Sequence, residues 1–172
     1  MTLLSNGRCG LVGLMCGVTF FAASCGHPEA AGKFISANIP LALYAATRVS
    51  RRVPKPTKFT FPILEIYNEL GALVYQGSES SLENARILRE LPASIRGLLA
   101  PSDAPRLISV LEAVPEFQAR EQEILRDRRP VLLSIELQNC EACVIQADAL
   151  NDAAPRLLRQ SMDVLVLKVS PF

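Results

Sequence analysis

The stretch that decides the fold is Val131-Leu132-Leu133-Ser134-Ile135-Glu136-Leu137, followed after two residues by Cys140-Glu141-Ala142-Cys143. The first seven residues are almost continuously apolar, which is typical of a strand covered on both faces in the middle of a sheet. Helical periodicity then runs over residues 143–150. Cysteines at i and i+3 share one helical face, and the first lies where free backbone N–H groups stabilise a thiolate. This order predicts two thiols suited to disulfide exchange.

The segments on either side complete the pattern of the last third. Val164-Leu165-Val166-Leu167-Lys168-Val169 predicts a further strand, and Pro155 is expected to start or kink the helical stretch before it. Strand, helix and strand in this order imply a parallel crossover. Upstream, Pro105–Val114 and Glu116–Arg128 predict two helical stretches broken at Pro115.

A second group of elements begins near Phe59. Ile63–Tyr67 and Ala72–Gln76 are rich in β-forming residues and are separated by Asn68-Glu69-Leu70-Gly71, so they predict an antiparallel hairpin. Ser80-Ser81-Leu82-Glu83 has the form of a capping box, and apolar residues at helical spacing follow as far as Leu91. The chain is therefore predicted to be α/β, with a central mixed sheet flanked by helices.

The N-terminus has the anatomy of a secretory signal. From Cys9 to Pro28 there is no charged residue, Arg8 supplies a basic start, and Ala22-Ala23-Ser24 is a small-residue exit. A membrane-spanning helix is the alternative, but the apolar run is short for a span and contains three glycines. We therefore predict a signal peptide at residues 1–24.

Ala22-Ala23-Ser24-Cys25 resembles the lipobox of bacterial lipoproteins. The resemblance implies a lipoprotein-type signal, lipidation of Cys25 and attachment to a membrane of the bacterial cell envelope, facing the periplasm. Ala22 departs from the family's preferred leucine, which leaves ordinary secretion open. Gly26 replaces the aspartate that retains such proteins in the inner membrane, so the resemblance favours the outer membrane.

Residues 25–58 are predicted to be a tether, and residues 59–172 the folded domain. Between Arg48 and Lys58 there are five positive charges, two prolines and no acid, which is typical of a solvated linker. The alternative is that these charges contact anionic headgroups beside the anchor. The conformation of Phe34–Ala46 stays open.

Cysteine usage and charge narrow the chemistry. Of five cysteines, only Cys140 and Cys143 remain if the signal is removed and Cys25 is acylated, so an oxidising compartment would favour their pairing. His27 is the chain's single histidine, which argues against a zinc site and a catalytic triad. Beyond Cys25 there are 17 acidic and 17 basic residues, so no global field for nucleic acid is expected.

The region 116–169 resembles periplasmic thioredoxin-like proteins, through a helix, Arg129-Pro130, an apolar strand and Cys140-Glu141-Ala142-Cys143. The resemblance implies a thioredoxin-like fold, with Cys140 as nucleophile and Cys143 as resolving cysteine. It implies no cofactor, and partners that are protein thiols and disulfides of the cell envelope. Thr60-Phe61-Pro62-Ile63 resembles the later half of that family, where a cis-proline opens the strand that faces the cysteines, so Pro62 is the expected cis-proline.

That later half normally follows the cysteines, whereas here it precedes them. Either the domain is permuted, with residues 59–91 completing the sheet and Pro62 near Cys140, or these strands embellish a truncated domain. A Pro62 remote from the sulfurs, or a trans Phe61–Pro62 bond, would count against permutation.

Two functions follow. The first is a membrane-tethered thiol-disulfide oxidoreductase. Asn139 replaces the aromatic residue that is usual in thioredoxin-like proteins, and the charge of Glu141 should raise the pKa of Cys140. Reductase or isomerase character is therefore expected. The second is a non-catalytic module that binds a protein, with the cysteines as a structural clasp. Glu65 and Glu136 are expected to face solvent, since acids are seldom fully buried; the alternative is a buried acid near the cysteines that shuttles protons.

Overall fold

The computed structural model describes residues 31–50, 60–78, 80–91 and 100–171. Its elements are, in chain order, β1 (Phe34–Pro40), α1 (Leu41–Ser50), β2 (Ile63–Tyr67), β3 (Leu73–Ser78), α2 (Ser81–Glu90), α3 (Ile108–Leu111), α4 (Pro115–Gln118), α5 (Glu121–Arg126), β4 (Val131–Leu137), α6 (Glu141–Arg159) and β5 (Asp163–Ser170). The five strands form one sheet in the order β1-β5-β4-β2-β3.

The sheet is mixed. Strands β1, β5 and β4 run parallel to one another, and β2 is antiparallel to both β4 and β3. The predicted α/β class, with a mixed sheet flanked by helices, is therefore confirmed. β4 lies between β5 and β2, the central position that its continuous apolar run predicts.

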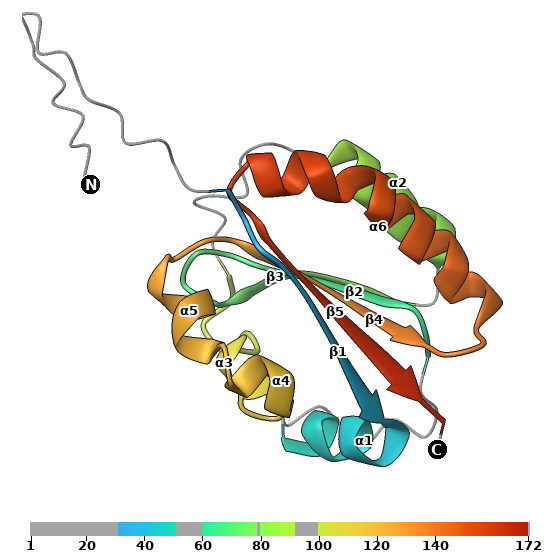
Figure 1. Cartoon of the computed structure of the whole chain (residues 1–172), viewed down its shortest axis with the longest axis horizontal. Coiled ribbons are helices and arrows are strands. Elements are labelled where there is room, and N and C mark those ends of the chain that lie inside the picture. Colours follow the sequence, from blue (N-terminus) through green and yellow to red (C-terminus); the bar gives the residue numbers. More distant parts are fainter. Residues whose placement is uncertain (1–30, 51–59, 79, 92–99, 172) are drawn as a thin grey trace, which may run out of the picture.

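Helices cover the sheet on both faces, as Figure 1 shows. One apolar core lies between the sheet and α2 with α6, and includes Leu64, Leu132 and Leu150. The other lies between the sheet and α1 with the short helices α3, α4 and α5, and includes Tyr44 and Phe117. Because side chains alternate along each strand, odd and even positions of β4 point into different cores.

The predicted tether of residues 25–58 needs correction. Residues 34–50 form β1 and α1, and β1 is an edge strand that pairs with β5 along its whole length. The alternation Ile35, Ala37, Ile39 is buried on one side only, while the residues between them are exposed. The folded domain therefore includes β1 and α1, which precede Phe59.

The connection between residues 105 and 128 holds three short helices where the sequence predicts two helical stretches. Val114 is extended, which ends α3 before Pro115 opens α4 at a position where proline is favoured. The opposite outcome holds at Pro155, which lies inside α6 without ending it. In the hairpin between β2 and β3, Gly71 takes a φ of 68°, the left-handed region that a glycine enters at no steric cost.

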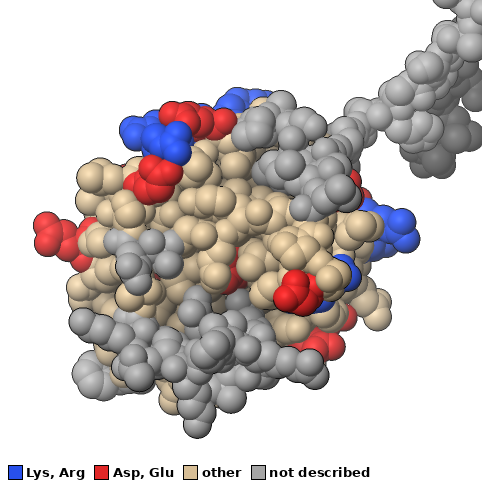
Figure 2. Space-filling view, turned by 180° about the vertical axis from the view of Figure 1, so that it is seen from behind, with Lys and Arg blue, Asp and Glu red and all other residues tan. Residues whose placement is uncertain are grey.

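Charges of both signs are scattered over the face shown in Figure 2, and they form no patch of one sign over its described part. No helix among the described residues is long and apolar enough to cross a membrane. The N-terminal signal prediction and the lipidation residue, Cys25, lie outside the described residues.

Candidate functional site

Cys140 and Cys143 form a disulfide at the junction between β4 and α6, and their Cα atoms are 5.2 Å apart. The chain turns between them and the strand through Asn139, whose φ of 62° is one that asparagine tolerates better than most residues. The Gln138 N–H donates to the Val169 carbonyl oxygen (2.9 Å), which prolongs the β4–β5 pairing up to this turn. The strand and the turn together fix where the helix starts.

Cys140 is the N-cap residue of α6. Its backbone is extended, and its Sγ accepts a hydrogen bond from the Cys143 backbone N–H at 3.1 Å. The first turn of a helix has unpaired N–H groups and a partial positive charge, and both favour a thiolate over a thiol. Reduction of the disulfide would therefore leave the Cys140 sulfur in an electropositive corner.

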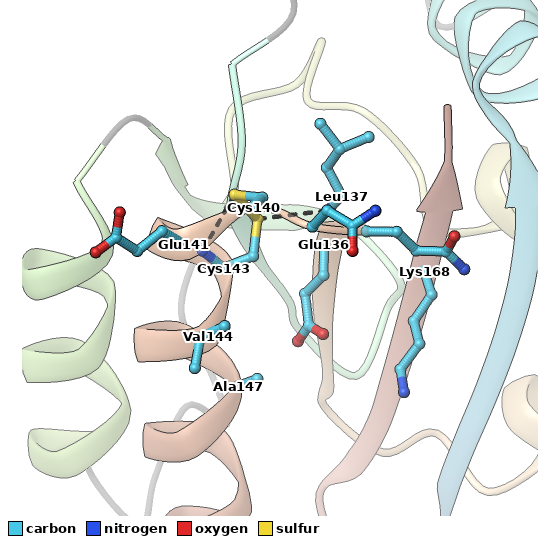
Figure 3. Close-up of a pocket in the computed structure, with 10 residues that line it drawn as sticks. Glu136, Leu137, Cys140, Glu141, Cys143, Val144, Ala147 and Lys168 are labelled. Carbon is cyan, nitrogen blue, oxygen red and sulfur yellow. Dashed lines mark hydrogen bonds between the residues drawn. A yellow bond between two sulfur atoms is a disulfide. The ribbon is translucent and has the colours of Figure 1, made fainter. Parts of the chain in front are cut away.

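The two sulfurs differ in access. The Cys143 residue is 4% exposed, whereas Cys140 is half-buried. Cys143 Sγ also accepts a hydrogen bond from the Leu137 backbone N–H at 3.4 Å, on the side of the strand, as Figure 3 shows. An incoming reactant meets Cys140 first, which fits an attacking role for Cys140 and a resolving role for Cys143.

A cavity of about 460 Å³ lies against the disulfide. It is open to solvent and lies among the end of β4, the first two turns of α6 and β5. Its lining combines both cysteines, apolar side chains, amides and charged groups, namely Glu136, Leu137, Gln138, Asn139, Cys140, Glu141, Cys143, Val144, Ala147 and Lys168. Val144 is 58% exposed, which is high for a large apolar side chain and leaves an apolar surface beside the sulfurs.

Glu136 is a buried acid, so its predicted solvent-facing placement is wrong. The residue is 8% exposed, and its Oε1 accepts a hydrogen bond from the Ser134 hydroxyl at 2.8 Å. Burial raises the pKa of the Glu136 carboxyl, while the Ser134 hydroxyl and the charge of Lys168 oppose that rise. A carboxyl of this kind can exchange a proton inside the cavity that both cysteines line.

A chain of buried polar side chains holds Glu136 in place. Gln146, on α6, donates from Nε2 to the Ser134 hydroxyl oxygen (2.8 Å) and to the Ile63 carbonyl oxygen (3.0 Å). Its Oε1 accepts from Asn84 Nδ2 on α2 at 2.6 Å. One side chain thus joins two helices and two strands directly beneath the disulfide, because Gln146 lies one turn of α6 after Cys143.

The sequence alone did not identify Ser134, Gln146 or Asn84 as part of the site. A polar residue at each of these positions, on a face otherwise apolar, was the available signal. Their partners come from distant parts of the chain, so the contacts could not be read from local pattern.

Pro62 lies beside this site. The Phe61–Pro62 peptide bond is cis, the geometry that the resemblance implies. The β2–β4 register pairs Ile63 with Ile135, which places Pro62 next to the carboxyl end of β4, from which the chain continues to Cys140. The ring of Phe61 packs against Tyr44 of α1, with centroids 5.4 Å apart, so α1 supports this segment from the other face of the sheet.

Glu65 is buried too, but elsewhere. It is 1% exposed, accepts a hydrogen bond from the Tyr67 hydroxyl (2.6 Å) and another from Gln76 Nε2 (2.9 Å). Like Ile63 and Tyr67, it points to the face covered by α1, opposite to α6. The expectation that Glu65 faces solvent is wrong, and the sheet separates this acid from the cysteines.

Within the described ranges, no three His, Cys, Asp or Glu side chains come together as a metal site. Cys9, Cys16, Cys25 and His27 lie outside those ranges. No protein-family model matches this chain, and neither the curated proteins nor the solved structures include a significant match to it.

Proposed function

We propose that this protein is a thiol-disulfide oxidoreductase in which Cys140 and Cys143 are the reacting pair. The observation that carries the proposal is the placement of the disulfide: its outer sulfur caps the amino end of α6 beside an open cavity, and its inner sulfur lies behind. Such a placement supplies an accessible, stabilised thiolate together with a resolving thiol.

The reaction starts from the reduced pair. The Cys140 thiolate attacks one sulfur of a client disulfide, the client S–S bond breaks, and the departing client thiolate takes a proton from water. Cys143, as a thiolate, then attacks Cys140 Sγ, which restores the intramolecular disulfide and releases the second client thiol. The client gains the two electrons that the pair loses, and both released client thiolates take their protons from water. Another dithiol, from a protein or a small molecule, is the reductant that returns the pair to its starting state.

Glu136 is the group we assign to accept the Cys143 proton before the second step. Its carboxyl lines the same cavity as Cys143, and burial raises its pKa, which makes its carboxylate a stronger base. The carboxylate of Glu141 lies next to Cys140 in sequence and disfavours a strongly stabilised thiolate. The pair should therefore act as a reductant or isomerase, not as a strong oxidant.

A permuted thioredoxin-like fold is the architecture we propose for this chain. Residues 60–91 complete the sheet from the side of β2, with Pro62 at the end of the sheet where the cysteines lie. Incorporation of β2 between β4 and β3 supports permutation over the alternative of an embellished, truncated domain.

For the location we propose the periplasmic side of the bacterial cell envelope, with a lipid at Cys25. Eight residues separate Cys25 from β1, a reach of at most about 30 Å when fully extended. β1 begins at the amino ends of the parallel strands, whereas Cys140 follows the carboxyl end of β4. An anchor at Cys25 would therefore hold the domain with its disulfide facing away from the membrane. Intact-mass measurement of the membrane-extracted protein tests the lipid.

The test of the redox function is capture of the mixed disulfide. With Cys9, Cys16 and Cys25 replaced by alanine, Cys143→Ser in the full chain should retain a peptide disulfide substrate as a covalent adduct at Cys140, and Cys140→Ser should not. The parent protein should reduce the same peptide when a dithiol is supplied. Equal trapping by both variants, or no turnover by the parent, would refute the proposal.

The second candidate is the protein-binding module with a structural clasp, which the burial of Cys143 favours. In that case, reduction should lower stability with no adduct formed by the Cys143→Ser variant. The same experiment therefore separates the two functions.

A further inference from the structure

The disulfide has an exposed side chain of opposite charge on each flank. Glu141 follows Cys140 on the first turn of α6, and its carboxylate points toward α2. Lys168 lies on β5, on the other side of the sulfurs and next to β1. Figure 3 shows the two side chains diverging from the disulfide, and both residues line the cavity.

Neither charge is neutralised within the described part of the chain. Neither Lys168 nor Glu141 forms an ion pair with another described residue, and on α2 the acids Glu83 and Glu90 pair with Arg86. On β1 the residue in register with Lys168 is Asn38, which is uncharged. Each flank therefore presents one unpaired charge to whatever lies across the sulfurs.

Glu136 does not cancel Lys168 at the surface. It is the β4 residue in register with Lys168, but it is 8% exposed and its Oε1 accepts the Ser134 hydroxyl beneath the cavity. The Glu136 carboxyl and the Lys168 ammonium group interact electrostatically, but only Lys168 is exposed to solvent. The charge that solvent meets on this flank is that of Lys168.

We propose, on the basis of the oxidoreductase function above, that the client is an extended polypeptide that crosses the disulfide with an acidic side chain over Lys168 and a basic side chain beside Glu141. Between these two contacts, the apolar surface of Val144 and Ala147 accepts the aliphatic part of the client next to its cysteine. The two charges thus select clients whose reacting cysteine lies between one acidic and one basic residue, because two acidic or two basic neighbours would place a like charge on one flank.

The test compares three peptide disulfides, Asp-Ala-Cys-Ala-Lys, Asp-Ala-Cys-Ala-Asp and Lys-Ala-Cys-Ala-Lys, each joined to the same uncharged thiol and each rate divided by that of the same peptide with a small uncharged dithiol. At low salt the full chain should reduce the first about tenfold faster in kcat/KM than either of the others, since each of those exchanges an attractive pair for a like-charge pair and each exposed pair contributes about threefold. At about 0.5 M salt the difference should largely disappear, because screening acts on exposed charges.

Charge reversal makes the assignment specific. Lys168→Glu should reverse the preference, so that Lys-Ala-Cys-Ala-Lys is reduced faster than Asp-Ala-Cys-Ala-Lys, and Lys168→Met should abolish the preference between these two peptides. Arg159→Glu, an exposed change in the last turn of α6, is the matched control and should leave the preference intact.

The outcomes separate this inference from the proposed function. Equal relative rates for the three peptides, or a preference for Asp-Ala-Cys-Ala-Lys over Lys-Ala-Cys-Ala-Lys that survives Lys168→Glu, would overturn the inference while leaving the redox function standing. Absence of exchange even with an uncharged peptide disulfide would instead remove the redox function.

Discussion

Replacement of Gln146 by leucine is expected to lower the free energy of unfolding by about 3 kcal/mol, because Gln146 is fully buried and holds three partners. It donates to the Ile63 carbonyl and to the Ser134 hydroxyl, and it accepts from Asn84. Leucine has a similar volume, so the change removes hydrogen bonds and leaves little cavity. The helix that carries the disulfide would lose its main polar attachment to the sheet.

The magnitude follows from the groups left without a partner. A buried polar group that loses its partner costs about 1–3 kcal/mol. Asn84 Nδ2 loses its acceptor, while the Ile63 carbonyl and the Ser134 hydroxyl oxygen each lose a donor. Ser134 keeps its bond to Glu136, so its loss is smaller than the other two. Two full losses and one partial loss give about 3 kcal/mol.

Urea unfolding of the oxidised protein measures this change. With an m-value of about 2 kcal/mol/M, the midpoint should fall by about 1.5 M while m stays constant. Gln122→Leu, an exposed change on α5, is the matched control and should move the midpoint little. In addition, Asn84→Ala combined with Gln146→Leu should cost about 1 kcal/mol less than the sum of the single changes, since the two side chains share a bond.

A loss below about 0.5 kcal/mol, the range of ordinary surface substitutions, would refute the reasoning, as would strict additivity with Asn84→Ala. Either result would mean that the polar chain beneath the disulfide adds nothing to the packing around it.

Three further changes test other parts of the structure. Burial raises the folded pKa of Glu136 above its ordinary 4.5, so the contribution of Glu136 to stability is present at low pH and is lost as the pH rises through the folded pKa. Glu136→Gln should flatten this fall and be at least as stable as the parent near neutral pH. Parallel curves of stability against pH for the two proteins would contradict this explanation, and the exposed Glu112→Gln is the control. Arg129→Met should lower stability by about 3 kcal/mol near neutral pH, because it leaves the fully buried Asp163 carboxylate without its guanidinium partner. The loss should shrink in acid as Asp163, whose pKa burial already raises, takes up a proton, and a loss that does not vary with pH in thermal unfolding would count against this explanation. Ser80→Ala should cost about 1 kcal/mol, measured by urea unfolding, by removing the N-cap bond to the Glu83 backbone N–H (3.2 Å), and Ser80→Thr should restore most of it.

The sequence predicted the central elements well because their signals are local. The apolar run Val131–Leu137, the cysteines after it and the strand near Val164 are each recognisable from neighbouring residues, and they form β4, the start of α6 and β5. The capping box at Ser80 likewise marks the start of α2.

The features that the sequence missed depend on distant partners. β1 is an edge strand whose exposed face carries Phe34, Ser36, Asn38 and Pro40, and among the described strands it pairs with β5, near the other end of the sequence. Glu136 can be buried because the Ser134 hydroxyl donates a hydrogen bond to its carboxylate, and Gln146 in turn donates a hydrogen bond to the Ser134 hydroxyl oxygen. The alternation of Ile35, Ala37 and Ile39 was a local signal for β1, but the partner strand of β1 and the burial of Glu136 depend on tertiary contacts that the local pattern does not show.

The strand order has a consequence for biosynthesis. During synthesis, β1, β2 and β3 leave the ribosome first, yet β4 and β5 lie between β1 and the β2–β3 hairpin in the sheet. The hydrogen bond from the Lys33 backbone N–H to the Asp163 carboxylate also spans 130 residues. Until the last third of the nascent chain emerges, β1 and β2 lack their partners β5 and β4, and the apolar faces of these strands stay exposed to water. Long-range strand pairing of this kind is slow and prone to aggregation, so the newborn polypeptide should depend on chaperones until its central strands arrive.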